Sequence, residues 1–124
     1  MPHRIRLVAV SVCVLGAGVA LGPTQSTAAP IAHASRSCNV PAYPGSGYFT
    51  SLSVKHVSCR FGRRLALAYY RCRTRSGPAG RCHRRRVLRY RCTEVRQSIA
   101  VEIDGRVTCK RGHMRVVHTY QQNL

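Results

Sequence analysis

The sequence contains few acidic residues, and this scarcity limits how its charge can be compensated. Its 124 residues include 3 Asp and Glu residues against 21 Lys and Arg residues, which gives a formal net charge of +18. The three carboxylates, at Glu94, Glu102 and Asp104, cannot neutralise so many cations within the chain. The positive charge must therefore face water or an anionic partner, and its self-repulsion opposes the compact state.

Motifs that mark common enzymes and metal sites are also missing. The chain contains no G-x-S-x-G nucleophile turn, no H-E-x-x-H site and no phosphate-binding loop. No two cysteines form a C-x-x-C pair and the histidines share no ligand spacing, so we expect no metal site and no cofactor. The alternative is a zinc site with the ligands Cys72, Cys82, His83 and Cys92. The wide spacing of these residues disfavours it.

The longest apolar run is short for a membrane span. It covers residues 7–21, whereas a transmembrane helix needs about 20 apolar residues. Two arginines precede the run and a polar stretch of small residues follows it, which is the layout of a secretory signal peptide. Cleavage after Ala28 or after Ala34 fits, and Ala34 is the better match to an A-x-A site. We therefore predict a signal peptide over residues 1–34 and a secreted protein, extracellular or in the cell envelope. A single uncleaved membrane anchor is the alternative.

Of the seven cysteines, six lie outside the predicted signal peptide. They are Cys38, Cys59, Cys72, Cys82, Cys92 and Cys109. An even number of cysteines in a small exported chain predicts a disulfide framework, which stabilises a modest core by constraining the unfolded chain. Spacing alone leaves many pairings open. The pair that we favour is Cys72–Cys82, because the turn-rich segment Ser76–Gly80 between them can bring its ends together.

Hydrophobic periodicity predicts a small α+β domain over residues 48–124, preceded by an irregular leader over residues 35–47. Alternation predicts a strand at Tyr48–Val54. Its inward face would hold Tyr48, Thr50, Leu52 and Val54. Ser58 is a suitable N-cap for an amphipathic helix of about fifteen residues. The apolar stripe of that helix, which should pack into the core, comprises Phe61, Leu65, Ala68, Tyr69 and Cys72.

The last third of the chain predicts antiparallel strands that end in a three-stranded meander covering the helix. A strand at Val87–Cys92 would point Leu88 and Tyr90 inward. Asp104-Gly105 predicts the first turn of the meander, with Gly105 in a left-handed conformation. Arg111-Gly112 predicts the second turn. The apolar residues that this register places on one face are Ile99, Val101, Val107, Cys109, Met114 and Val116.

The most basic stretch runs from Arg71 to Arg91 and contains nine arginines and no carboxylate. Guanidinium groups bind phosphates and carboxylates through charge and paired hydrogen bonds, so this stretch predicts an anion-binding site. The predicted site residues are Arg73, Arg75, Arg81, Arg84, Arg85, Arg86, Arg89 and Arg91. Few aromatic side chains accompany them, so binding should depend strongly on salt and weakly on base sequence.

The chain contains the segments Y-F-T-S-L-S-V-K-H-V-S-C, residues 48–59, and V-T-C-K-R-G-H-M-R-V-V-H-T-Y, residues 107–120. Together these two segments resemble a loose group of short secreted cysteine-containing proteins of unknown function from high-GC bacteria. The resemblance covers about residues 45–120. It implies one small strand–helix–strands domain, and it carries no activity, substrate or catalytic residue.

The sequence thus predicts an exported, non-enzymatic cationic domain that binds an anionic polymer or surface: a cell-wall polymer, a nucleic acid or a membrane. One alternative is a surface charge without a specific partner. A second is a protease inhibitor that presents the Ser76–Gly80 loop between Cys72 and Cys82. A third is a secreted ribonuclease, which would need a carboxylate base, a histidine acid and an arginine. Its candidate carboxylates and histidines are Glu94, Glu102, His113 and His118.

Overall fold

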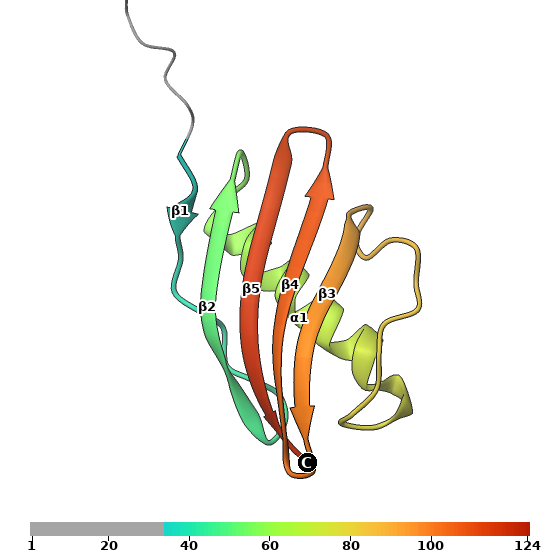
Figure 1. The fold of residues 1–124 in the computed structure, drawn as a ribbon. Coiled ribbons are helices and arrows are strands. Elements are labelled where there is room, and N and C mark those ends of the chain that lie inside the picture. The colour runs from blue at the N-terminus through green and yellow to red at the C-terminus, as the bar shows by residue number, and fades with distance from the viewer. Residues whose placement is uncertain (1–33) are drawn as a thin grey trace, which may run out of the picture. The chain divides into compact units, whose positions relative to one another are not determined.

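The structure, a computed structural model, describes residues 34–124 as one helix packed against one face of a five-stranded antiparallel sheet (Figure 1). The helix is α1 (Cys59–Arg73), followed by the short 3-10 helix η1 (Thr74–Ser76). The strands are β1 (Arg36–Ser37), β2 (Gly47–Lys55), β3 (Arg91–Ile99), β4 (Glu102–Arg111) and β5 (Met114–Asn123). Their order across the sheet is β1-β2-β5-β4-β3, which confirms the α+β class and the C-terminal meander. Except for Ala34, the predicted signal peptide lies outside the described residues.

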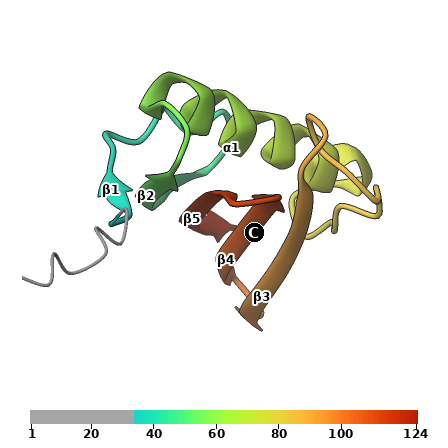
Figure 2. The same ribbon diagram turned by 90° about the horizontal axis from the view of Figure 1, so that it is seen from above.

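Helix α1 confirms the prediction for this segment, including its first residue. The Ser58 hydroxyl accepts a hydrogen bond from the Phe61 backbone N–H at 3.1 Å, which caps the helix. Leu65 and Tyr69 are buried against the sheet, with Val107 and Val116 among the strand residues of the core. Figure 2 shows α1 lying over one face of the sheet, here called the inner face, while no other element of residues 34–124 covers the outer face.

The predicted inward face of β2 is half wrong. Leu52 and Val54 are buried as expected, but Tyr48 and Thr50 are exposed, and Phe49 is buried instead. The cause is an irregularity in the pairing with β5 between Phe49 and Ser51, where one extra residue interrupts the alternation. The leader is also not wholly irregular, because Arg36–Ser37 pair with β2 as strand β1.

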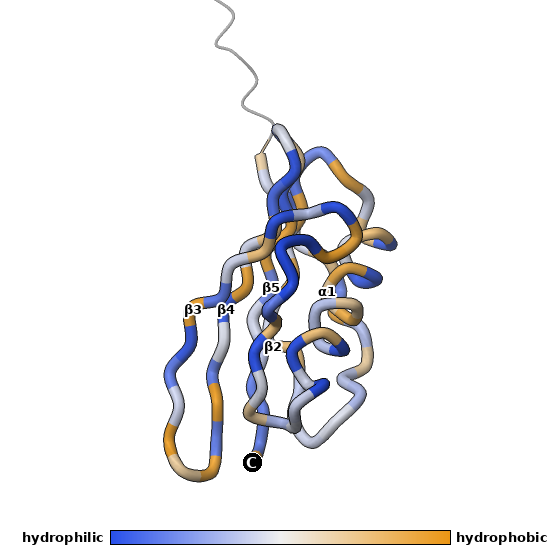
Figure 3. Tube along the Cα trace, turned by 90° about the vertical axis from the view of Figure 1, so that its right-hand side faces the viewer, coloured by the Kyte–Doolittle hydropathy of each residue, from blue (hydrophilic) through white to orange (hydrophobic). Residues whose placement is uncertain are grey.

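The first turn of the meander lies elsewhere than predicted. Strands β3 and β4 join at Ala100 and Val101, and Asp104-Gly105 lies inside β4. The observed register turns Ile103 inward, whereas Ile99 and Val101 are exposed at the hydrophobic tip of the hairpin (Figure 3). The register still places apolar residues on the inner face, but it buries Ile103 and leaves Ile99 and Val101 exposed.

The second turn is displaced by one residue, and the strand predicted at Val87–Cys92 begins later. Gly112 and His113 connect β4 to β5, so that Arg111 pairs with Met114 and Cys109 with Val116. Val87 pairs with Tyr90 across a tight turn, and β3 starts at Arg91. Leu88 therefore lies at the tip of that turn and is 40% exposed, not inward.

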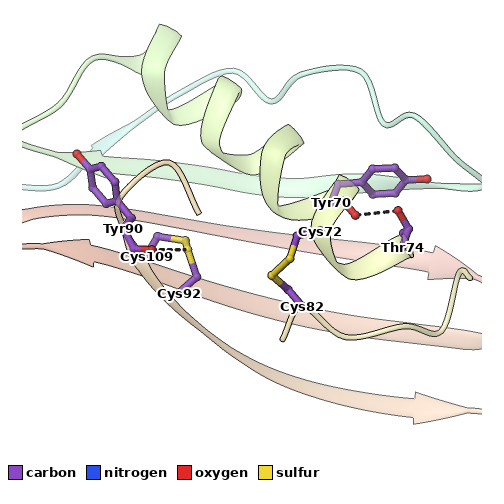
Figure 4. The surroundings of a disulfide bond; sticks show 7 residues. All are labelled: Tyr70, Cys72, Thr74, Cys82, Tyr90, Cys92 and Cys109. Atoms are coloured by element: carbon purple, nitrogen blue, oxygen red, sulfur yellow. Dashed lines mark hydrogen bonds between the residues drawn. A yellow bond between two sulfur atoms is a disulfide. The ribbon is translucent and has the colours of Figure 1, made fainter. Parts of the chain in front are cut away.

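Three disulfides connect all six cysteines of the described residues: Cys38–Cys59, Cys72–Cys82 and Cys92–Cys109. The favoured pair Cys72–Cys82 is confirmed, and the zinc alternative is wrong because its three cysteines are oxidised. Figure 4 shows Cys72–Cys82 near the end of α1 and Cys92–Cys109 between neighbouring strands. Disulfides of this number are typical of proteins that fold in an oxidising, extracellular-type compartment. Within residues 34–124, no helix is long and apolar enough to span a membrane.

Candidate anion-binding site

A hollow lined by cations lies where the arginine-rich loop meets the β4–β5 turn. Its volume is about 300 Å³. The residues that line it are Arg86, Arg89, Arg91, Lys110, Arg111 and Gly112. Among the residues that the structure describes, no carboxylate lines it. We call it the cationic hollow. Three of its five cations belong to the predicted anion-binding set, and Lys110 and Arg111 were not predicted.

The turn between Val87 and Tyr90 positions three of the four arginines of the cationic hollow, Arg86, Arg89 and Arg91. Val87 and Tyr90 are buried, and each donates its backbone N–H to the carbonyl of the other at 2.9 Å. The Tyr90 hydroxyl also donates to Met114 Sδ at 3.4 Å. Leu88 and Arg89 at the tip have φ angles of 45° and 70°, a left-handed conformation that turns of this kind usually assign to Asn or Gly. Such backbone strain, of order 1–3 kcal/mol per residue, is found most often at functional sites.

A row of four cations crosses the outer face of the sheet. In register, Arg91 on β3 lies opposite Lys110 on β4, Lys110 lies opposite Arg115 on β5, and Arg115 lies opposite Lys55 on β2. We call these four residues the cation row. Three neighbouring like-charge pairs are unfavourable in a sheet. The sequence signal was the basic hairpin K-R-G-H-M-R, but the row becomes visible only when the register is known.

The four exposed arginines of the predicted set that lie outside the cationic hollow are found in three different environments. Arg84 and Arg85 are exposed in the irregular segment before Arg86, and Arg75 is exposed in η1. Arg81 Nη1 lies 3.8 Å from Glu94 Oε2, the one ion pair formed between residues 34–124. The structure therefore does not bring all eight predicted residues together.

Arg73 is a correction to the predicted set, because it is buried. Its exposed fraction is 1%. Its guanidinium donates to the Pro78 carbonyl at 2.7 Å and to Gln122 Oε1 at 3.0 Å, donates also to the Tyr43 hydroxyl, and lies 4.2 Å from the centre of the Tyr120 ring. The physical reason is helical spacing, since Arg73 follows Tyr69 by four residues and so extends the buried stripe. Arg73 holds the fold together and cannot contact an external anion.

A second guanidinium holds the same loop. Arg96 on β3 donates from Nη1 to the Gly80 carbonyl at 2.9 Å and from Nη2 to the Ala79 carbonyl at 3.0 Å. Together with the Arg73 bond to Pro78, this binds three successive carbonyls between Cys72 and Cys82. The loop is thus fixed from inside by two arginines as well as by the disulfide.

The residues of the ribonuclease alternative are not assembled at the surface. Glu94 and His118 both face the interior: the Glu94 side chain is 5% exposed and His118 is 1% exposed. Val107 on β4 lies between them in the sheet. Burial, with a smaller contribution from the Arg73 charge, lowers the pKa of His118 to about 4. Glu102 begins β4 and His113 lies in the turn that follows it, so these two residues stand at opposite ends of the strand. In the part of the chain from 34 to 124, no three His, Cys, Asp or Glu residues could hold a metal ion.

The fold and the site define a small disulfide-bonded α+β domain with one strongly cationic region. No protein family, curated protein or solved structure matches the chain.

Proposed function

We propose that this protein is an exported, non-enzymatic domain that binds an anionic polymer or surface through the cationic hollow. The observation that carries the proposal is the lining of the hollow, which presents five cations without a carboxylate. The predicted signal peptide and the three disulfides support export. Arg84 and Arg85, exposed beside Arg86, are further predicted contacts for a ligand larger than the hollow.

Physical chemistry favours a polymer over a single small anion as the ligand. Each phosphate or sulfate that a cation neutralises releases counterions from the polymer, and this release drives binding. The logarithm of the binding constant should therefore fall linearly with the logarithm of the salt concentration. No aromatic side chain of residues 34–124 lines the hollow, so stacking on bases contributes little and the sequence of a nucleic acid should matter little.

The test is retention of the oxidised, exported protein on immobilised heparin and on double-stranded DNA over a salt series. The test variant changes three hollow residues, Arg89→Gln, Lys110→Gln and Arg111→Gln. The matched control removes the same charge elsewhere with Arg60→Gln, Arg71→Gln and Arg106→Gln, which are exposed on α1 and β4. We expect the hollow variant to elute at much lower salt than the control. Equal elution of the two variants would show that net charge alone retains the protein.

Protease inhibition is a second candidate, favoured by the bonds from Arg73 and Arg96 to the loop carbonyls. A loop that is rigid before binding loses little entropy on binding. The check is residual activity of trypsin-like and subtilisin-like proteases at increasing protein concentration. Inhibition that persists in the hollow variant and disappears in Arg96→Met would favour this function over polyanion binding.

A further inference from the structure

We propose that the ligand is a linear phosphate-bearing polymer that lies across the strands, along the cation row, from the cationic hollow at β3 to Lys55 on β2. This inference rests on the proposed function and specifies the path and chemistry of its ligand. It makes the outer face of the sheet, which the prediction from sequence did not include, part of the binding site.

The side chains of the cation row point away from α1. Their chain neighbours Cys109, Val116 and Val54 are buried in the core beneath the helix. Because successive side chains of a strand alternate between the two faces, Lys110, Arg115 and Lys55 must lie on the outer face. That face is uncovered in the described part of the chain (Figure 2), and Arg91, Lys110 and Arg115 are exposed on it.

The cation row and the cationic hollow form one continuous surface. Arg91 and Lys110 belong to both. Neighbouring strands lie about 4.8 Å apart, so the two steps from β4 through β5 to β2 extend the surface by ~10 Å beyond the hollow. The seven cations of the combined surface are Lys55, Arg86, Arg89, Arg91, Lys110, Arg111 and Arg115. The ion pair formed within residues 34–124, Arg81–Glu94, uses none of them.

The position of the acidic residues favours a ligand that crosses the strands over one that runs along β4. Along β4, the outer-face residues after Lys110 are Thr108, Arg106, Asp104 and Glu102. A polyanion that ran along the strand would therefore meet two carboxylates at its far end. A polyanion that crosses the strands meets only cations, so electrostatic repulsion disfavours the first path and not the second.

The residues beside the row favour phosphate. The next outer-face row contains the hydroxyls of Thr93 on β3, Thr108 on β4 and Ser53 on β2, with Val117 on β5 between Thr108 and Ser53. A phosphate group has enough acceptor oxygens to bind a guanidinium and a hydroxyl at once. Aromatic side chains are absent from these two rows in the described sheet, so recognition uses the backbone charges of the polymer.

The experiment measures binding of orthophosphate, triphosphate and long-chain inorganic polyphosphate to the oxidised, exported protein over a salt series. The row variant is Lys55→Gln with Arg115→Gln, and the matched control is Arg60→Gln with Arg106→Gln. For long-chain polyphosphate, removing two contacts should lower the slope of log affinity against log salt by about 1.4. Triphosphate, which is short enough to stay in the hollow, should bind the row variant and the wild type alike. The control should keep the wild-type slope.

Other outcomes would overturn this inference, and they differ from those that would overturn the proposed function. A row variant with the wild-type slope for long-chain polyphosphate would show that the ligand does not follow the row, while the hollow could still bind it. Equal affinity for poly-glutamate of the same charge number would overturn the preference for phosphate. Loss of the proposed function would appear instead as equal elution of the hollow variant and its own matched control from heparin.

Discussion

Tyr120 on β5 lies over Gly105, its cross-strand partner on β4, and its ring occupies the space where any other residue would place a side chain. This arrangement lets the Tyr120 hydroxyl reach past β4 and donate to Glu94 on β3. The buried Arg73 guanidinium lies over the same ring, 4.2 Å from its centre. A glycine inside a strand thus permits the contact that links the sheet to the end of the helix.

We predict that Gly105→Ala destabilises the protein by about 1–3 kcal/mol, because the added methyl group must displace the Tyr120 ring from the core. Urea unfolding of the oxidised protein measures the effect. The control is the same substitution in a Tyr120→Ala background, where the methyl group has room. Additive losses in the double variant would show that the two residues do not compete for space.

Arg73 and Arg89 should separate stability from binding. Arg73→Met removes a buried cation and leaves the Pro78 carbonyl without its donor, at a cost of about 1–3 kcal/mol, whereas Gln122 Oε1 keeps its hydrogen bond from the Tyr43 hydroxyl. We therefore expect a clearly lower melting temperature and an unchanged affinity of the folded protein for heparin. Arg89→Met, at the exposed tip of the turn, should leave the melting temperature unchanged and lower the affinity for heparin. A large loss of heparin affinity in folded Arg73→Met would contradict the assignment of Arg73 to the core.

The sequence predicts the helix well because its signals are local. Ser58 caps it and the buried stripe repeats at helical spacing, so both can be read without knowing what packs against them. The Cys72–Cys82 bridge is predictable for the same reason, since it closes a short loop. The register of β4 is not local: Asp104-Gly105 has turn composition, but Tyr120, fifteen residues later, is the reason for the glycine.

The candidate site shows the same division. Arg86, Arg89 and Arg91 are close in sequence and were predicted together, and the structure brings them to one hollow. Lys55 and Arg115 join them only through the pairing of β2 with β5, which a sequence pattern does not specify. Composition alone puts Arg73 in the anion-binding set because charged residues are seldom buried, although helical spacing places it on the same face of α1 as Tyr69.

Stability should rise as pH rises between about 4 and 6.5, through His118. The pKa of His118 in the fold is lowered to about 4, mainly by burial, whereas an unfolded histidine has a pKa near 6.5. Between these values the unfolded chain binds one more proton, so acidification favours unfolding, by up to ~3 kcal/mol. The loss is complete below about pH 4. Unfolding free energies of the wild type and of His118→Leu, measured from pH 7 to 4, isolate the contribution. If both proteins lose stability equally over this window, His118 is not the titrating group.

Relieving the like-charge contacts of the cation row should stabilise the unliganded protein while weakening ligand binding. Arg115 lies between Lys110 and Lys55, so Arg115→Gln removes two unfavourable cross-strand contacts at once. Each is worth about 0.2–1 kcal/mol, and salt should reduce the gain because the side chains are exposed. The measurement is the melting temperature at low and high salt, with and without long-chain polyphosphate.

Arg106→Gln, whose neighbours on β3 and β5 are Val95 and Thr119, is the control that relieves no such contact. We expect Arg115→Gln to melt above the wild type without polyphosphate at low salt and to gain less from its addition. A variant that melts lower under the first condition would mean that the cations of the row do not repel one another in the folded protein.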